Sequence, residues 1–85
     1  MADETAEEIA QHFSAMGDSV NLINAIVADD TEDVAQNGAA EVKLRITRNT
    51  DHLEIQIAKD WYAESSVTKT SYTDAVTAGK AYVAG

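Results

Sequence analysis

Residues 41–58, EVKLRITRNTDHLEIQIA, contain two runs of alternating apolar and polar residues, and this alternation constrains the fold more than any other feature. Successive side chains of a β-strand point to opposite faces, so strict alternation is typical of a strand with one buried face. The apolar residues of the two runs are Val42, Leu44, Ile46, Leu53, Ile55 and Ile57. The pattern therefore predicts an antiparallel β-hairpin over 41–58.

The predicted hairpin has a well-specified register about a turn at Asn49 and Thr50. With that turn, apolar residues face apolar residues across the strand pair, and Arg45 faces Glu54. A slip by one residue would break both kinds of pairing, because the side chains alternate with a period of two. The turn type stays open, since Asn tolerates a positive φ whereas the β-branched Thr50 resists it.

Residues 1–29 are predicted to form an acidic helix. Thr5 and Glu8 have the spacing of a capping box, which marks a helix start. The apolar residues that follow are spaced alternately by four and three, as in a heptad seam: Ile9, Phe13, Met16, Val20, Ile23 and Val27. One helix through Gly17 is the simplest interpretation, and a break there into two helices is the alternative. We expect the seam to pack on the protein's own sheet, with self-association as the other option.

The other segments complete a single α+β domain. Residues 30–40 are rich in Asp, Thr, Asn and Gly and predict a linker, and 59–70 predict a polar loop. Residues 71–85 predict a C-terminal helix with apolar residues on one face. The element order is α-β-β-α. The long N-terminal helix packs on the hairpin, and Val76 and Val83 of the C-terminal helix close one side of the core.

Charge is distributed unevenly along the chain. The net charge is −9, and residues 1–41 contain ten acidic residues and no Lys or Arg. Phosphate groups would be repelled by this half, which argues against binding to nucleic acid or to an anionic membrane. The same half can dock on a basic protein surface. No apolar run is long enough for a membrane span, and the start does not resemble a signal peptide, so a cytoplasmic protein is expected.

Residue patterns for catalysis or metal binding are weak. The chain has no Cys, which excludes disulfides and thiolate metal sites. His12 and His52 are far apart and lack a carboxylate at ligand spacing. Asp29, Thr31 and Asp33 match the first spacings of a calcium loop, but its glycine and final glutamate are missing. We therefore predict a protein that is not an enzyme and has no catalytic residue, metal or cofactor.

The candidate partner-binding residues are aromatic and charged. Trp61 and Tyr62 either plug one end of the core or anchor a partner, since Trp and Tyr are enriched at interface hot spots. The other candidates are the charged residues of the hairpin's polar face and of the acidic segment at the linker: Lys43, Arg45, Asp29, Asp30, Glu32 and Asp33.

Two C-terminal segments, HLEIQIAKDWY at 52–62 and SYTDAVTAGKAYVAG at 71–85, resemble stretches of short uncharacterised proteins of tailed bacteriophages, particularly those of marine cyanobacteria. The resemblance covers about 26 of the 85 residues and carries over no catalytic or binding residue. It implies a small virion or assembly component, or an early protein that manipulates the host. Either would be located in the host cytoplasm or in the virion.

The expected function is non-enzymatic protein interaction or assembly. A two-stranded hairpin has open edges, which pair readily with a second copy or with another protein. A homo-oligomer is one expected form. The alternative is an acidic inhibitor or adaptor that binds a basic site on a host enzyme in place of nucleic acid. Binding of that kind would weaken steeply as salt is added.

Overall fold

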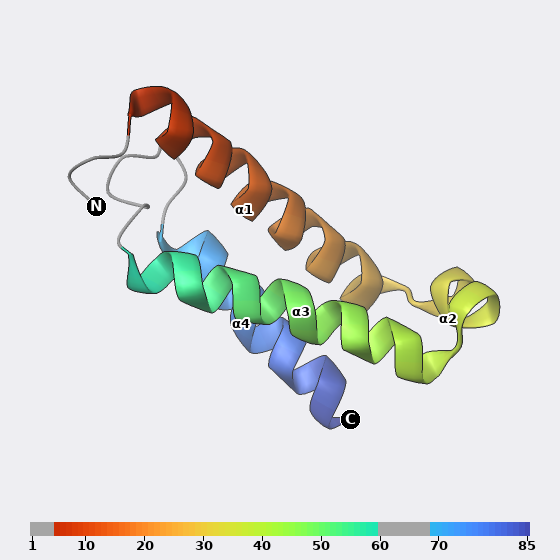
Figure 1. Cartoon of the computed structure of the whole chain (residues 1–85). Helices are drawn as coiled ribbons and strands as arrows, with labels where there is room; N and C mark the ends of the chain where they lie inside the picture. Colours follow the sequence, from red (N-terminus) through yellow and green to blue (C-terminus); the bar gives the residue numbers. More distant parts are fainter. Residues whose placement is uncertain (1–4, 60–68) are drawn as a thin grey trace.

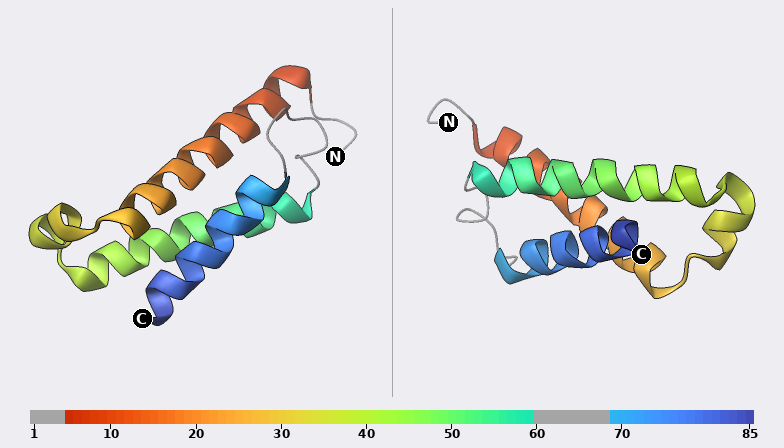
Figure 2. Two further views of the ribbon diagram at one scale, coloured as in Figure 1. Left: turned by 180° about the vertical axis from the view of Figure 1, so that it is seen from behind. Right: turned by 90° about the horizontal axis from the view of Figure 1, so that it is seen from below.

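The computed structural model describes residues 5–59 and 69–85, and every regular element within them is an α-helix (Figure 1). The helices are α1 (Ala6–Ala28), α2 (Thr31–Asn37), α3 (Ala39–Ala58) and α4 (Lys69–Ala84). The three long helices pack on one another, and α2 contacts α3 at one end (Figure 2). Along the chain, α1, α3 and α4 run alternately in opposite directions.

Helix α1 begins at the predicted capping box. The Glu8 N–H donates to the Thr5 hydroxyl over 3.1 Å, and the Thr5 N–H donates to the Glu8 carboxylate over 3.4 Å. The two bonds satisfy backbone donors that a helix start leaves without partners. The helix continues through Gly17 without a break. The capping box and the single long helix are therefore confirmed.

The buried face of α1 follows the heptad seam over most of its length. Met16 and Ile23 are completely buried. The partly buried residues Ile9, Phe13 and Val20 pack against the same core. At the C-terminal end the buried residue is Ile26, whereas Val27 is 42% exposed. The buried face moves away from the heptad positions toward the end of the helix, because a straight helix has 3.6 residues per turn and a heptad repeat needs 3.5.

The predicted α+β fold and its β-hairpin at 41–58 are wrong, because these residues form helix α3. Four of the six apolar residues in the two runs share one side of a helix and face the core: Val42, Ile46, Leu53 and Ile57. The other two, Leu44 and Ile55, lie on the opposite side and are 42% and 56% exposed. The apolar residues of the two alternating runs thus lie on two opposite faces of one helix.

Polar residues interrupt the buried stripe of α3 and hide its helical period in the sequence. The Thr50 hydroxyl donates to the Ile46 carbonyl over 2.8 Å, and the Asn49 side-chain amide donates to the Arg45 carbonyl over 2.8 Å. A polar side chain inside a helix bundle is tolerated when its hydrogen-bonding groups have partners. Thr50 is 3% exposed, so its bond to its own helix is what permits its burial.

The segment 30–40, expected as a linker, contains the short helix α2. Gly38 joins α2 to α3 with a φ of +86°, a conformation that glycine adopts at little cost. Helix α4 starts at Lys69, two residues before the predicted start. Trp61 and Tyr62 lie outside the described residues.

The core lies where α1, α3 and α4 meet. From α4, Tyr72 and Ala75 are each 1% exposed and pack against the buried residues of the other two helices. Gly79 is also buried, and a methyl group at its Cα would collide with the Thr50 hydroxyl. Glycine therefore allows α4 to approach α3 closely at this crossing.

Candidate interaction surface

Ser19, Asn49 and His52 form a polar cluster between α1 and α3. The Ser19 Oγ lies 2.9 Å from Asn49 Oδ1 and 3.0 Å from His52 Nδ1. Because a carbonyl oxygen can only accept, the serine hydroxyl donates to Asn49, and His52 Nδ1–H donates to the serine oxygen. A serine nucleophile needs the reverse arrangement, with histidine accepting the hydroxyl proton. The cluster, with Ser19 only 5% exposed, therefore links the two helices rather than activating the serine.

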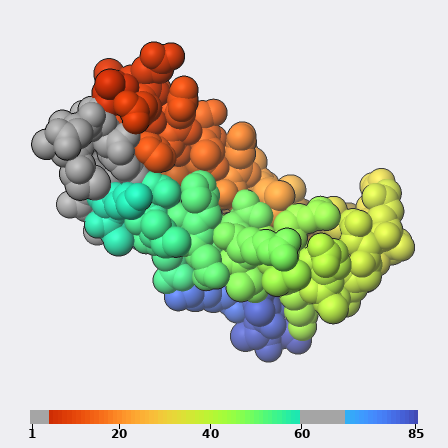
Figure 3. Space-filling model, viewed as in Figure 1, coloured from red at the N-terminus to blue at the C-terminus, as the bar shows by residue number. Residues whose placement is uncertain are grey.

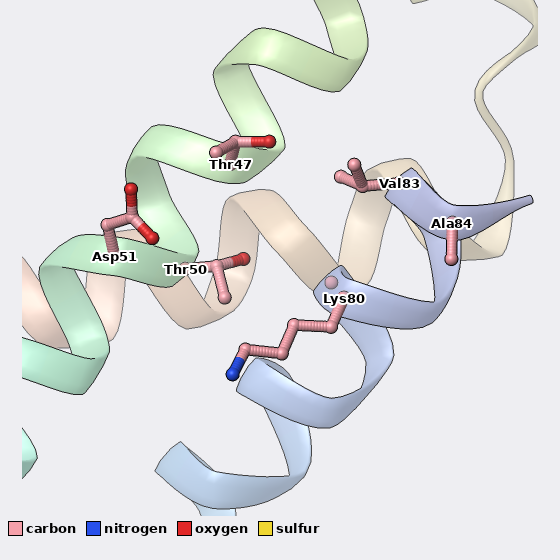
Figure 4. A pocket seen from close by; sticks show the side chains of 7 residues that line it. Thr47, Thr50, Asp51, Lys80, Val83 and Ala84 are labelled. Carbon is pink, nitrogen blue, oxygen red and sulfur yellow. The ribbon is translucent and has the colours of Figure 1, made fainter.

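A shallow groove runs between α3 and α4 (Figure 4). Its volume is about 220 Å³, and it is lined by Thr47, Thr50, Asp51, Gly79, Lys80, Val83 and Ala84. Both threonine hydroxyls donate to carbonyls of their own helix. The Lys80 ammonium forms an ion pair with Glu54 over 2.9 Å. Ligand pockets are typically larger, roughly 300–1,000 Å³, and have several convergent polar groups, so the groove does not suit a small-molecule site.

The acidic residues predicted to bind a partner lie at the corner between α1 and α2. Asp29 accepts a hydrogen bond from the Thr31 N–H over 3.1 Å. Hydrogen bonds from the side chain and backbone of Thr31 hold the pKa of Asp29 below its ordinary value. Glu32 is exposed and accepts a hydrogen bond from Gln36 one helical turn later.

Two other acidic residues of this corner contact distant parts of the chain. Asp30 accepts a hydrogen bond from the Tyr82 hydroxyl of α4 over 2.8 Å. Asp33 forms an ion pair with Arg45 of α3 at 4.0 Å. These contacts connect α2 to the rest of the bundle, so Asp30, Asp33 and Arg45 have structural partners within the chain.

Lys43 and Arg45 do not form one basic cluster. The hairpin would have put both side chains on its polar face, but residues two apart in a helix are separated by about 200° around the axis. Lys43 is half-buried on a different side of α3 from Arg45. Of the predicted binding residues, the structure brings only Asp33 and Arg45 into direct contact, and Trp61 and Tyr62 lie outside the described residues.

The hydrogen bond from Tyr82 to Asp30 predicts a dependence of stability on alkaline pH. The bond, together with burial and the negative charges of Asp30 and Asp33, raises the pKa of Tyr82 above its ordinary value of 10.0. A raised phenol pKa stabilises the folded protein below pH 10, and this contribution is lost as pH rises through the folded-state pKa.

We therefore expect the difference in unfolding free energy between wild type and Tyr82→Phe to be constant below pH 10 and to shrink above it. Urea unfolding of both proteins across neutral to alkaline pH measures this difference. Because other groups titrate in both proteins, the subtraction isolates Tyr82. A difference that does not change with pH would contradict the expectation.

The outer face of α3 is the surface that the sequence interpretation missed. Four residues spaced by four, three and four lie on the side of α3 opposite the core: Leu44, Arg48, Asp51 and Ile55. All four are exposed, although two of them are large and apolar. Figure 3 shows α3 crossing the front of the molecule without α1 or α4 over it. The spacing of these four residues is the signal that a helical projection of 41–58 would have revealed.

Comparisons with protein-family models, with curated proteins and with solved structures gave no match. Within residues 5–59 and 69–85, no group of three or more potential metal-binding side chains comes together. None of the helices described is both long and apolar enough to cross a membrane.

Proposed function

We propose that the protein is a non-enzymatic interaction or assembly module that contacts another protein chain through the outer face of α3. The observation that carries the proposal is the exposure of Leu44 and Ile55 on the same face of one helix. A single exposed apolar residue is ordinary on a protein surface. Leu44 and Ile55 lie three helical turns apart on one face, so a docking partner would find an apolar contact at each end of that face.

Other features of the structure support an interaction role over a catalytic one. The polar cluster of Ser19, Asn49 and His52 is occupied by contacts between helices. The groove beside α4 is small and its hydroxyls are engaged. Within this proposal, the resemblance of the C-terminal segments to phage proteins favours a virion or assembly component.

Photocrosslinking tests the proposed surface. A benzoylphenylalanine introduced at Ile55 should form a covalent protein adduct in the cells that make this protein. The same group at Asn21, an exposed residue of α1, should give little or none. Mass spectrometry identifies the adducts and separates a self-adduct from an adduct with another protein. Equal labelling at the two positions, or none at Ile55, would contradict the proposal.

A second candidate function follows from the acidic half of the chain. Exposed carboxylates lie along α1 and at its C-terminal end, including Glu7, Asp18 and Asp29, and residues 1–41 contain no Lys or Arg to balance them. This charge favours an adaptor or inhibitor that binds a basic site on an enzyme. Its binding would weaken as salt increases, whereas a contact through Leu44 and Ile55 would not depend on salt in that way.

A further inference from the structure

The outer face of α3 has an internal symmetry that its four residues define. Leu44 and Ile55 lie at equal distances from the midpoint between Asn49 and Thr50, and so do Arg48 and Asp51. The outer pair is apolar, and the inner pair has opposite charges. The spacing of four, three and four is the spacing of a helix seam.

We propose that the partner of this face is a second copy of the same chain, with the two α3 helices antiparallel about a twofold axis near that midpoint. In this arrangement Leu44 of one copy contacts Ile55 of the other. Arg48 of each copy forms an ion pair with Asp51 of the other. The inference rests on the proposed function, because it names the partner for the same surface.

The choice of a second copy follows from the requirement that a twofold interface be complementary to itself. If residue i contacts residue j across a twofold axis, residue j must also contact residue i. The face meets this requirement for both the apolar pair and the charged pair. The equal spacing itself comes with the helix, since any seam spaced four, three and four is symmetric about its midpoint. What favours a second copy is the residue types, because both outer positions are apolar and the two inner positions have opposite charges.

The charged pair gives the contact its direction and register. In a parallel arrangement in register, each Arg48 would face Arg48 of the other copy, and each Asp51 would face Asp51. The antiparallel arrangement replaces these repulsions with two attractive pairs. Charged residues along a helix seam specify orientation in this way, at some cost in stability.

The dimer is expected to be weak and to become tighter with added salt. The face is small, and small interfaces belong to weak or transient complexes. Each copy also has a net charge of −9, so the two copies repel each other over a long range. Salt screens this repulsion more than it screens the partly buried ion pairs. Adding salt should therefore favour the dimer, whereas binding to a basic partner would weaken.

Charge reversal tests the proposed pairing. Arg48→Asp places carboxylates opposite Asp51, and Asp51→Arg places guanidinium groups opposite Arg48. Each variant alone should have a dimer dissociation constant raised about tenfold or more, because like charges then meet twice. An equimolar mixture of the two variants should recover the wild-type affinity, since every facing pair in the mixed dimer is again of opposite sign.

Sedimentation equilibrium of the full chain up to the millimolar range measures these affinities, with far-UV circular dichroism to show that each variant keeps its helices. Asp18→Arg is the matched control for Asp51→Arg. It makes the same charge change at an exposed residue of α1, and it should retain the dimer. Both changes reduce the net negative charge of the chain by the same amount. If Asp51→Arg loses the dimer and Asp18→Arg keeps it, the loss cannot come from the overall charge of the two copies.

Three outcomes would overturn the inference: a wild-type chain that stays monomeric up to millimolar concentration, single variants that dimerise like wild type, or a mixture that stays monomeric. These outcomes are distinguishable from failure of the proposed function. If crosslinking at Ile55 captures a different protein and the chain is monomeric, the α3 face remains an interaction surface and only the assignment of a second copy fails.

Discussion

Replacing Leu53 by alanine is expected to lower the free energy of unfolding by about 2–5 kcal/mol, while the same replacement at Leu44 lowers it by less than about 1 kcal/mol. Leu53 is completely buried between the long helices, whereas Leu44 is 42% exposed on the outer face of α3. Removing buried methyl groups loses the hydrophobic transfer energy and leaves a cavity. Removing methyl groups from a side chain that already contacts water loses less of this energy and leaves no enclosed cavity.

The two substitutions are chemically identical, so their comparison reports burial alone. In a hairpin both leucines would face the same core, and the two losses would be similar. Thermal unfolding at low micromolar protein, where any dimer dissociates, measures both. The Leu53 variant should melt more than about 10 °C below wild type. Equal losses at the two positions would contradict the helical assignment of 41–58.

Replacing Gly79 by alanine is expected to destabilise the protein, while replacing Gly17 by alanine stabilises it. Both glycines lie inside long helices, where alanine gains about 0.5–1 kcal/mol of helix stability. A methyl group at Gly17 meets no atom within 4 Å, but one at Gly79 collides with the Thr50 hydroxyl. That hydroxyl is held by its bond to the Ile46 carbonyl and cannot move aside cheaply.

The difference between the two alanine variants isolates the crowding at the crossing of α3 and α4, because the gain in helix propensity is common to both. Crowding in a packed interior costs about 1–3 kcal/mol, so the two unfolding free energies should differ by that amount. Urea unfolding measures the difference. If crowding is the cause, Thr50→Ala should cost less stability in the Gly79→Ala background than in wild type. Additive effects would rule out a direct contact.

Helix α1 could be predicted from the sequence because its signals are local. The Thr5 and Glu8 pair lies within one turn, and the heptad spacing of its apolar residues repeats over the whole segment. Neither signal depends on what the helix packs against. The exact buried residue at the C-terminal end, Ile26 rather than Val27, depended on how the straight helix meets α3 and α4.

Helix α3 could not be predicted in the same way, because its apolar residues satisfy two periods at once. Val42, Ile46 and Leu53 belong to a strand face and also to a helix face. The helical stripe contains Asn49 and Thr50 at its centre, which made it look broken. Only the packed structure shows that these two side chains have hydrogen-bonding partners there.

The outer face of α3 was missed because of the same ambiguity between a strand period and a helix period. Leu44 and Ile55 belong to the predicted core of a hairpin, and the helix exposes them. The sequence also predicted that a partner binds Asp30, Asp33 and Arg45. In the structure Asp30 contacts Tyr82 and Asp33 contacts Arg45, and both contacts depend on how α2 and α4 fold back onto α3. Contacts between residues so far apart in the chain leave no local pattern in the sequence.

Local sequence patterns were sufficient for three features of this protein: the start and length of α1, the acidic first half, and the symmetric arrangement of residues about the midpoint of 41–58. Whether that symmetry belongs to two strands or to one helix depended on how the elements pack together. The outcome follows from which side chains the packed helices can bury. Packing against α1 and α4 buries one face of α3, so four of its six large apolar residues enter the core. Leu44 and Ile55 are left on the surface.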